Sequence, residues 1–145
     1  MEAVKRATPI VMAVSLLALP AAADASAFFK GPVNGGANNA GVEFRAKFHH
    51  GHPRKVLEFR WFNVPVPPRC YDSFEGTRFA MKVHAGRFRG DYDVSNTDHV
   101  AKVRGRFKHA GKKAVGRLEL EGSFAGGCAS ADTGWLHWVA RRPNG

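Results

Sequence analysis

The stretch Ala101-Lys-Val-Arg-Gly-Arg-Phe-Lys108 decides the fold class, because small or apolar residues alternate in it with basic residues. Its odd-numbered positions are Ala, Val, Gly and Phe, whereas every even-numbered position is Lys or Arg. A period of two is typical of a β-strand that buries one face and leaves the other in solvent. We therefore expect a strand with one dry face and one cationic face.

A second strand follows this one, because the same alternation resumes after a turn that we place at residues 110–113. Since the two apolar faces must lie on the same side of the sheet, their matching restricts the register of the hairpin. It predicts Arg104 opposite Glu119 and Lys102 opposite Glu121. Such pairs contribute only about 0.2–1 kcal/mol each, so their main effect is on register.

Alternating patterns recur on both sides of this hairpin, and no stretch has a convincing helical period. They predict further strands over residues 42–48, 57–61, 79–83, 87–89 and 135–141. Prolines at 65, 67 and 68 end the second of these, because proline donates no hydrogen bond to a sheet. The expected core residues of two of these strands are Leu57, Phe59, Trp61, Leu136, Trp138 and Ala140. Seven or eight short strands predict an all-β fold, either an antiparallel β-sandwich or a small β-barrel.

A short motif repeats in the second half of the chain, with a glycine two residues before an apolar residue. It occurs as Gly86-Arg-Phe88, Gly105-Arg-Phe107, Gly116-Arg-Leu118 and Gly122-Ser-Phe124, and the chain later closes on Trp138-Val-Ala-Arg141. With its two cysteines, the chain resembles small secreted bacterial all-β proteins that have a Gly-x-Phe pattern and a closing Trp-x-Ala-Arg. The resemblance covers most of residues 86–142 and implies the fold class, without an activity. Relief of crowding beside core aromatics explains the glycines equally well.

Residues 1–27 have the three parts of a secretory signal peptide: basic Lys5 and Arg6, an apolar run over residues 9–19, and small residues at the cleavage site. We expect cleavage before Phe28, with Asp24 as the alternative start. The mature chain is then a single domain over residues 28–145 in a secreted or extracytoplasmic location. The apolar run is shorter than the roughly 20 residues that span a bilayer, so we expect no transmembrane anchor.

Cys70 and Cys128 are the two cysteines of the chain. In an oxidising compartment an even, isolated pair predicts a disulfide bond. Such a bond would close a loop of about 58 residues, which stabilises a fold by roughly 4 kcal/mol in the chain-entropy model. Two separately buried thiols are the alternative.

Catalytic signatures are missing from the sequence, which has no nucleophile elbow, no zinc-protease motif and no phosphate loop. We therefore expect a non-catalytic protein without a cofactor. His49, His50 and His52 share one turn, and this spacing suits Zn²⁺ or Cu²⁺. A solvated hairpin tip explains them more simply, and we assign no metal site.

Basic residues are the remaining clue to function, because the formal net charge is +10. Between Arg78 and Lys113 there are ten Lys or Arg and three Asp. Alternation places most of the basic residues on the outward side of their strands, where they are candidates for anion binding. These candidates are Arg78, Lys82, Arg87, Arg89, Lys102, Arg104, Arg106 and Lys108.

A cationic sheet face would attract an anionic envelope polymer, a polysaccharide or lipid headgroups. Specific recognition of nucleic acid is not expected, because no recognition helix is visible. We expect a monomeric binding or envelope-associated module. The alternatives are a protein–protein interactor or inhibitor that uses the proline-rich loop 65–69, a barrel that binds a small ligand, and surface charge that only maintains solubility.

Overall fold

The computed structural model describes residues 24–66, 70–74, 80–94, 99–124 and 128–143. These ranges contain ten β-strands and one short 3-10 helix, η1 (Asn34–Asn39). The strands are β1 (Ala25–Pro32), β2 (Gly41–His49), β3 (His52–Val66), β4 (Cys70–Phe74), β5 (Met81–His84), β6 (Arg87–Val94), β7 (His99–Lys108), β8 (Lys113–Phe124), β9 (Cys128–Asp132) and β10 (Leu136–Arg141). The all-β class is therefore confirmed.

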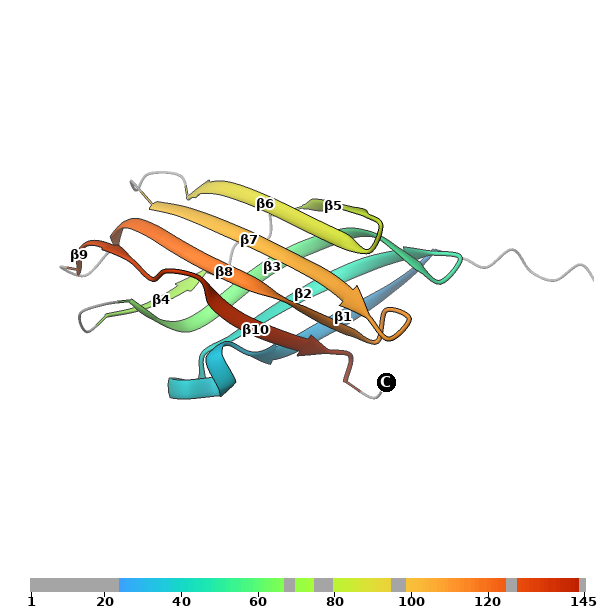
Figure 1. Ribbon diagram of the computed structural model, residues 1–145, viewed down its shortest axis with the longest axis horizontal. Helices are drawn as coiled ribbons and strands as arrows, with labels where there is room; N and C mark the ends of the chain where they lie inside the picture. The colour runs from blue at the N-terminus through green and yellow to red at the C-terminus, as the bar shows by residue number, and fades with distance from the viewer. Residues whose placement is uncertain (1–23, 67–69, 75–79, 95–98, 125–127, 144–145) are drawn as a thin grey trace, which may run out of the picture.

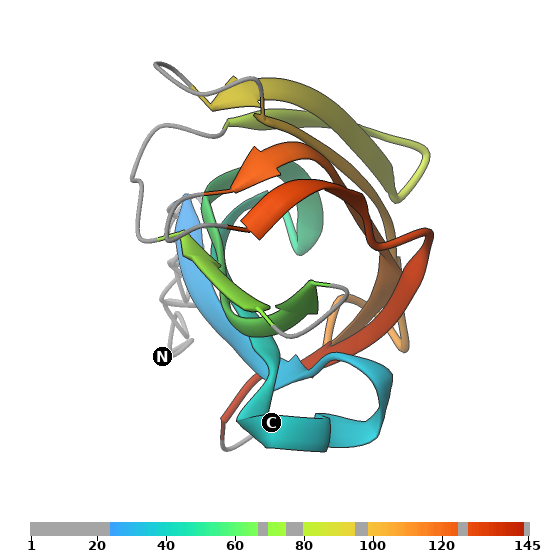
Figure 2. The same cartoon turned by 90° about the vertical axis from the view of Figure 1, so that its left-hand side faces the viewer.

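Eight of the strands close into one antiparallel ring (Figures 1 and 2). The order around the ring is β1-β2-β3-β5-β6-β7-β8-β10, and β10 pairs again with β1. Among the described residues, β4 pairs with β3 alone and β9 with β8 alone, so both are additions to the ring. The alternation left a sandwich and a barrel open, and the pairing of β10 with both β8 and β1 selects the barrel.

Aromatic side chains fill the interior of the ring. Phe29 and Phe44 stack with their ring centroids 5.0 Å apart, and Trp138 meets Phe44 edge to face at 5.9 Å. Phe59 also packs against Trp138, at 5.7 Å. These four rings are almost completely buried. The predicted core positions at Phe59 and Trp138 are thus confirmed, and so are Trp61 and Ala140.

Strand β3 departs from the predicted alternation at Glu58. This residue has a positive φ of 53°, and the register between β2 and β3 shifts opposite it. Both features mark a β-bulge, in which one extra residue changes which side chains face inward. Val56 is consequently buried, whereas Leu57 is half-exposed. The prediction that Leu57 belongs to the core is wrong for this reason.

Strand β3 also continues past the point where we expected it to leave the sheet. Pro65 lies within β3 and is the register partner of Tyr71 in β4. The described pairs of β2 with β3 end at Phe62, so Pro65 has a described neighbour on one side only. Proline is tolerated at such an edge position, because its missing N–H faces no partner strand. Residues 67–69 of the expected interaction loop lie outside the described part of the chain.

The hairpin of β7 and β8 keeps the predicted faces but has a different register. Lys102 lies opposite Glu119 and Arg104 opposite Arg117, so both expected register pairs, Arg104–Glu119 and Lys102–Glu121, are wrong. The turn occupies residues 109–112, one residue earlier than we placed it. His109 and Ala110 adopt positive φ angles there. The slip moves each residue to a partner two positions away, which preserves the inward and outward sides.

Strand β1 begins at Ala25, which pairs with Phe48 of β2. It therefore starts before Phe28, the mature start that we preferred. Residues 1–23, with most of the expected leader, lie outside the described residues. Within the described ranges, no helix has the length and apolar character needed to cross a bilayer.

The expected disulfide involves two residues whose side chains lie outside the described part of the protein. Cys70 is the first residue of β4, and Cys128 is the first residue of β9. Both strands extend from the ring at the same end of the barrel (Figure 1). The Cys70–Cys128 bond stays a prediction.

Candidate functional site: a basic groove

One row of residues across four neighbouring strands shapes the outer surface of the barrel. Phe88, Gly105, Gly116 and Trp138 are successive register partners on β6, β7, β8 and β10. Phe88 and Trp138 are 4% and 1% exposed, because their rings point into the core. A Cβ atom at Gly105 would collide with the Phe88 ring, and one at Gly116 with the Trp138 indole. The row therefore presents only backbone to the outside.

This row also explains part of the repeated glycine motif. Gly105 and Gly116 leave space inside the barrel for large rings on the neighbouring strands. The residue that follows each glycine points outward, because side chains alternate along a strand. The motif thus places an arginine, Arg106 or Arg117, on the outer surface beside the glycine row. A packing requirement inside the barrel and a cationic surface outside arise from the same motif.

Arginines stand on both sides of the glycine row. On one side, Arg89, Arg104 and Arg117 are consecutive register partners on β6, β7 and β8. On the other side, Arg87 of β6 lies opposite Arg106 of β7. We call these two sets of arginines the two arginine rows. Neighbouring strands are about 4.8 Å apart and two residues along a strand span about 7 Å, so arginines within a row are about 4.8 Å apart and the rows about 7 Å apart.

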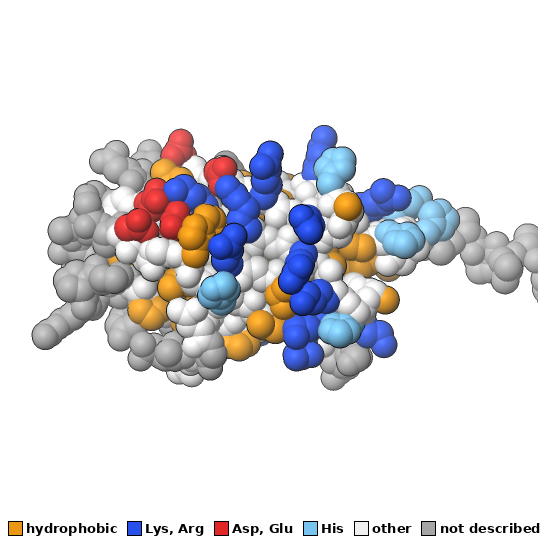
Figure 3. All heavy atoms as spheres, viewed as in Figure 1, with side chains coloured by type: hydrophobic (Ala, Val, Ile, Leu, Met, Phe, Trp, Pro, Cys, Tyr) orange, Lys and Arg blue, Asp and Glu red, His pale blue; other side chains and the backbone are white. Residues whose placement is uncertain are grey.

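The two arginine rows border an open groove of about 920 Å³ on the outer surface, which we call the basic groove. In Figure 3, blue side chains stand on either side of a pale strip of backbone. The cationic lining consists of Lys82, Arg87, Arg89, Arg104, Arg106 and Arg117. The other outward side chains in the lining are His84, Val115, His137 and Val139. Among the described residues of the lining there is no carboxylate.

Of the seven predicted anion-binding residues that the structure describes, five line this groove and two do not. Lys102 lies in a neighbouring ion-pair cluster, and Lys108 lines a separate hollow beside the hairpin tips. Arg78 lies outside the described residues. Arg117 was not among the candidates, although its outward position followed from the alternation, because the charge count ended at Lys113. His84 and His137 were missed because the closing of the ring brings β5 and β10 to the two ends of the groove.

Charge is compensated on the same strands just beyond the groove. The Lys102 ammonium donates hydrogen bonds to Glu119 at 2.9 Å and to Glu121 at 2.8 Å. Arg104 donates to the Asp91 carboxylate at 2.7 Å. We call Asp91, Lys102, Glu119 and Glu121 the balanced end. The bonds from Lys102 lower the pKa of Glu121, and those to both glutamates raise the pKa of Lys102.

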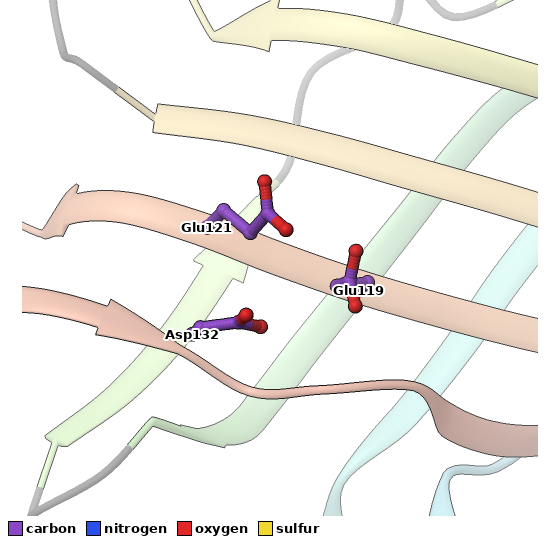
Figure 4. A group of neighbouring side chains, drawn as sticks. All are labelled: Glu119, Glu121 and Asp132. Carbon is purple, nitrogen blue, oxygen red and sulfur yellow. The ribbon is translucent and has the colours of Figure 1, made fainter.

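Three carboxylates gather at the balanced end (Figure 4). Their closest oxygen atoms, from Glu119, Glu121 and Asp132, lie within 4.8 Å of one another. The Lys102 ammonium already binds two of them, and Asp132 accepts a hydrogen bond from the Gly134 amide at 2.7 Å. A lysine thus supplies the positive charge that these carboxylates require.

An exposed tryptophan holds two of the groove arginines in place. The guanidinium carbon of Arg117 lies 5.0 Å from the centroid of the Trp135 ring, and that of Arg104 lies 5.7 Å from it. Cation–π contacts of this kind are worth about 0.5–1 kcal/mol at exposed sites. They restrict the two long side chains, so less conformational entropy is lost when an anion binds.

The three clustered histidines lie at the tip of the β2–β3 hairpin. His49 Nδ1 donates to the Asp24 carboxylate at 2.8 Å, and this bond lowers the pKa of Asp24. The rings of His49 and His50 meet edge to face, with centroids 4.1 Å apart. Among the residues that the structure describes, no group of three potential ligand atoms includes a histidine. The observed contact of this cluster with a carboxylate is therefore the His49–Asp24 pair.

No protein-family model matches the chain, and comparisons with curated proteins and with solved structures find no match. The class of protein is therefore defined by its fold and its candidate site: a small antiparallel barrel with a packed interior and a cationic groove on its outer surface.

Proposed function

We propose that the protein is a non-catalytic, extracytoplasmic binding module that holds an anionic polymer in the basic groove. The observation that carries the proposal is the pair of arginine rows without a lining carboxylate. Like charges directly opposite one another destabilise a sheet. Arg87 and Arg106 nevertheless lie directly opposite each other, and neither forms an ion pair with a described residue. An external anion that bridges the rows would remove this repulsion.

The alternatives have less support from the described part of the molecule. A small-ligand barrel requires an internal cavity, whereas the interior is packed with rings such as Phe29, Phe44 and Trp138. Charge that serves only solubility would be spread over the surface. The groove instead concentrates arginines on both sides of one strip of backbone.

Binding to a sulfated polysaccharide column tests the proposal directly. We expect salt-sensitive retention, because exposed charges are screened as ionic strength rises. The triple variant Arg87→Gln, Arg89→Gln and Arg106→Gln should lose affinity by roughly tenfold or more. With three fewer cationic contacts, fewer counterions are released from the polymer on binding. Lys47→Gln, Arg54→Gln and Lys55→Gln remove the same charge from exposed positions on β2 and β3 and form the matched control. Equal loss in both triple variants would contradict a groove-specific site.

The extracytoplasmic part of the proposal is tested by the mass of the exported protein. We expect a chain that begins at Asp24, because this start retains the whole of β1. We also expect the mass to be lower by two hydrogens, owing to a Cys70–Cys128 bond between the two strands that leave the same end of the ring. An uncleaved chain with both thiols free would contradict this part of the proposal and leave groove binding untouched.

A further inference from the structure

We propose that the occupant of the basic groove is an unbranched acidic polysaccharide that lies across strands β5 to β10. This inference rests on the proposed function and names the class of polymer.

The shape of the groove fits an extended chain. Its lining comes from β5, β6, β7, β8 and β10, which are consecutive around the ring. With neighbouring strands about 4.8 Å apart, the groove runs for roughly 20 Å. Cations line one side on β6, β7 and β8 and the other side on β6 and β7, and the rows are about 7 Å apart. A single inorganic anion would occupy a small part of such a site, whereas a chain with regularly spaced anionic groups would contact both arginine rows.

One border of the groove is suited to sugar rings. Val115 lies opposite Arg106, and Val139 lies opposite Val115, so the two valines continue one arginine row as half-buried outward side chains. Beside them runs the strip of backbone at Gly105 and Gly116, which carries no outward side chain. A pyranose ring has an apolar C–H face and polar edges, so it can rest against this border with its charged substituents at the sides. Guanidinium groups bind carboxylates and sulfates through paired hydrogen bonds.

The aromatic rings near the groove argue against single-stranded nucleic acid. Sequence-tolerant binding of single strands depends on free aromatic faces on which bases stack. Phe88 and Trp138 lie beneath the groove and are almost fully buried. Trp135 is exposed, but Arg104 and Arg117 lie over its ring. In the described part of the groove the phosphates would find cations, whereas the bases would find no free ring.

Four probes of matched charge test this inference by calorimetry at one salt concentration: oligogalacturonate, inorganic polyphosphate, oligothymidylate and phosphatidylglycerol vesicles. We expect oligogalacturonate to bind most tightly, with an affinity that rises with chain length until the oligomer spans the groove. The double variant Val115→Thr and Val139→Thr keeps the shape of both side chains and reduces the apolar character of this border of the groove. It should weaken oligogalacturonate binding roughly fivefold and leave polyphosphate binding unchanged.

The outcomes separate this inference from the proposed function. Tighter binding of polyphosphate, oligothymidylate or vesicles would overturn the polysaccharide assignment, and the binding-module proposal would stand. Equal effects of the threonine variant on oligogalacturonate and polyphosphate would also overturn it, because the two valines would then make no selective contact with sugar. Absence of binding to every probe would overturn both.

Discussion

The basic groove and the balanced end lie side by side on the same strands, yet they treat charge in opposite ways. At the balanced end, Lys102 binds two glutamates and Arg104 reaches Asp91. In the groove, Arg87 and Arg106 face each other without a described ion pair. Backbone geometry is shared, so the difference lies in the side chains. It indicates that the balanced end stabilises the barrel, and it supports the proposal that the groove binds an external anion.

The largest expected effect comes from breaking the balanced end. Lys102→Met leaves Glu119, which is 8% exposed, beside Glu121 without their shared cation. Unpaired carboxylates near one another are unfavourable. We expect the midpoint of thermal unfolding, followed by circular dichroism, to fall by several degrees.

Lys47→Met is the control for this substitution, because Lys47 is an exposed residue of β2. Its effect should stay within about 0.5 kcal/mol, as is usual at surface positions. If both variants unfold at the same temperature, the balanced end contributes nothing particular to stability.

A smaller effect of opposite sign is expected in the groove. The triple variant Arg87→Gln, Arg89→Gln and Arg106→Gln removes repulsion between facing arginines, so the free energy of unfolding should rise by about 0.5 kcal/mol. The gain should shrink at high salt, because salt screens exposed charges. Urea unfolding at two salt concentrations measures both. A destabilised variant would show that the arginines already have a partner within the protein.

The smallest effect is a difference in acid sensitivity between the two regions. Hydrogen bonds from Arg104 and Lys102 hold the pKa values of Asp91 and Glu121 below their ordinary values of 3.8 and 4.5. A carboxylate with a lowered folded-state pKa stabilises the protein above its unfolded-state pKa, and the contribution disappears as pH falls through the folded-state value. We therefore expect the unfolding midpoint to decrease below about pH 4.5.

The double variant Asp91→Asn and Glu121→Gln should show a smaller decrease of the unfolding midpoint at acidic pH. Thermal unfolding measured from neutral to acidic pH tests this. The groove triple variant should retain the full decrease, because its substitutions leave both carboxylates in place. The same decrease in the carboxylate variant as in the unchanged protein would contradict the assignment of acid sensitivity to the balanced end.

The side of the sheet to which each residue points was readable from the sequence, whereas the register between neighbouring strands was not. Alternation correctly placed Trp138 and Ala140 inside, because adjacent side chains must point to opposite faces. The Arg104–Glu119 pairing was wrong because a turn one residue earlier preserves the same faces. Leu57 was misplaced because the bulge at Glu58 leaves no mark in a binary pattern. Strands β1, β4 and β9 were missed, because their sequences do not alternate clearly.

By itself, the sequence determined the all-β class, most of the inward and outward positions, and the excess of basic residues, because these depend on local alternation and composition. Only the tertiary structure decided that the sheet closes, since closure depends on the pairing of β10 with β1 and β8. Closure also decided the candidate site. It brings His137 and Val139 of the last strand beside arginines of β7 and β8, which joins distant segments into one groove.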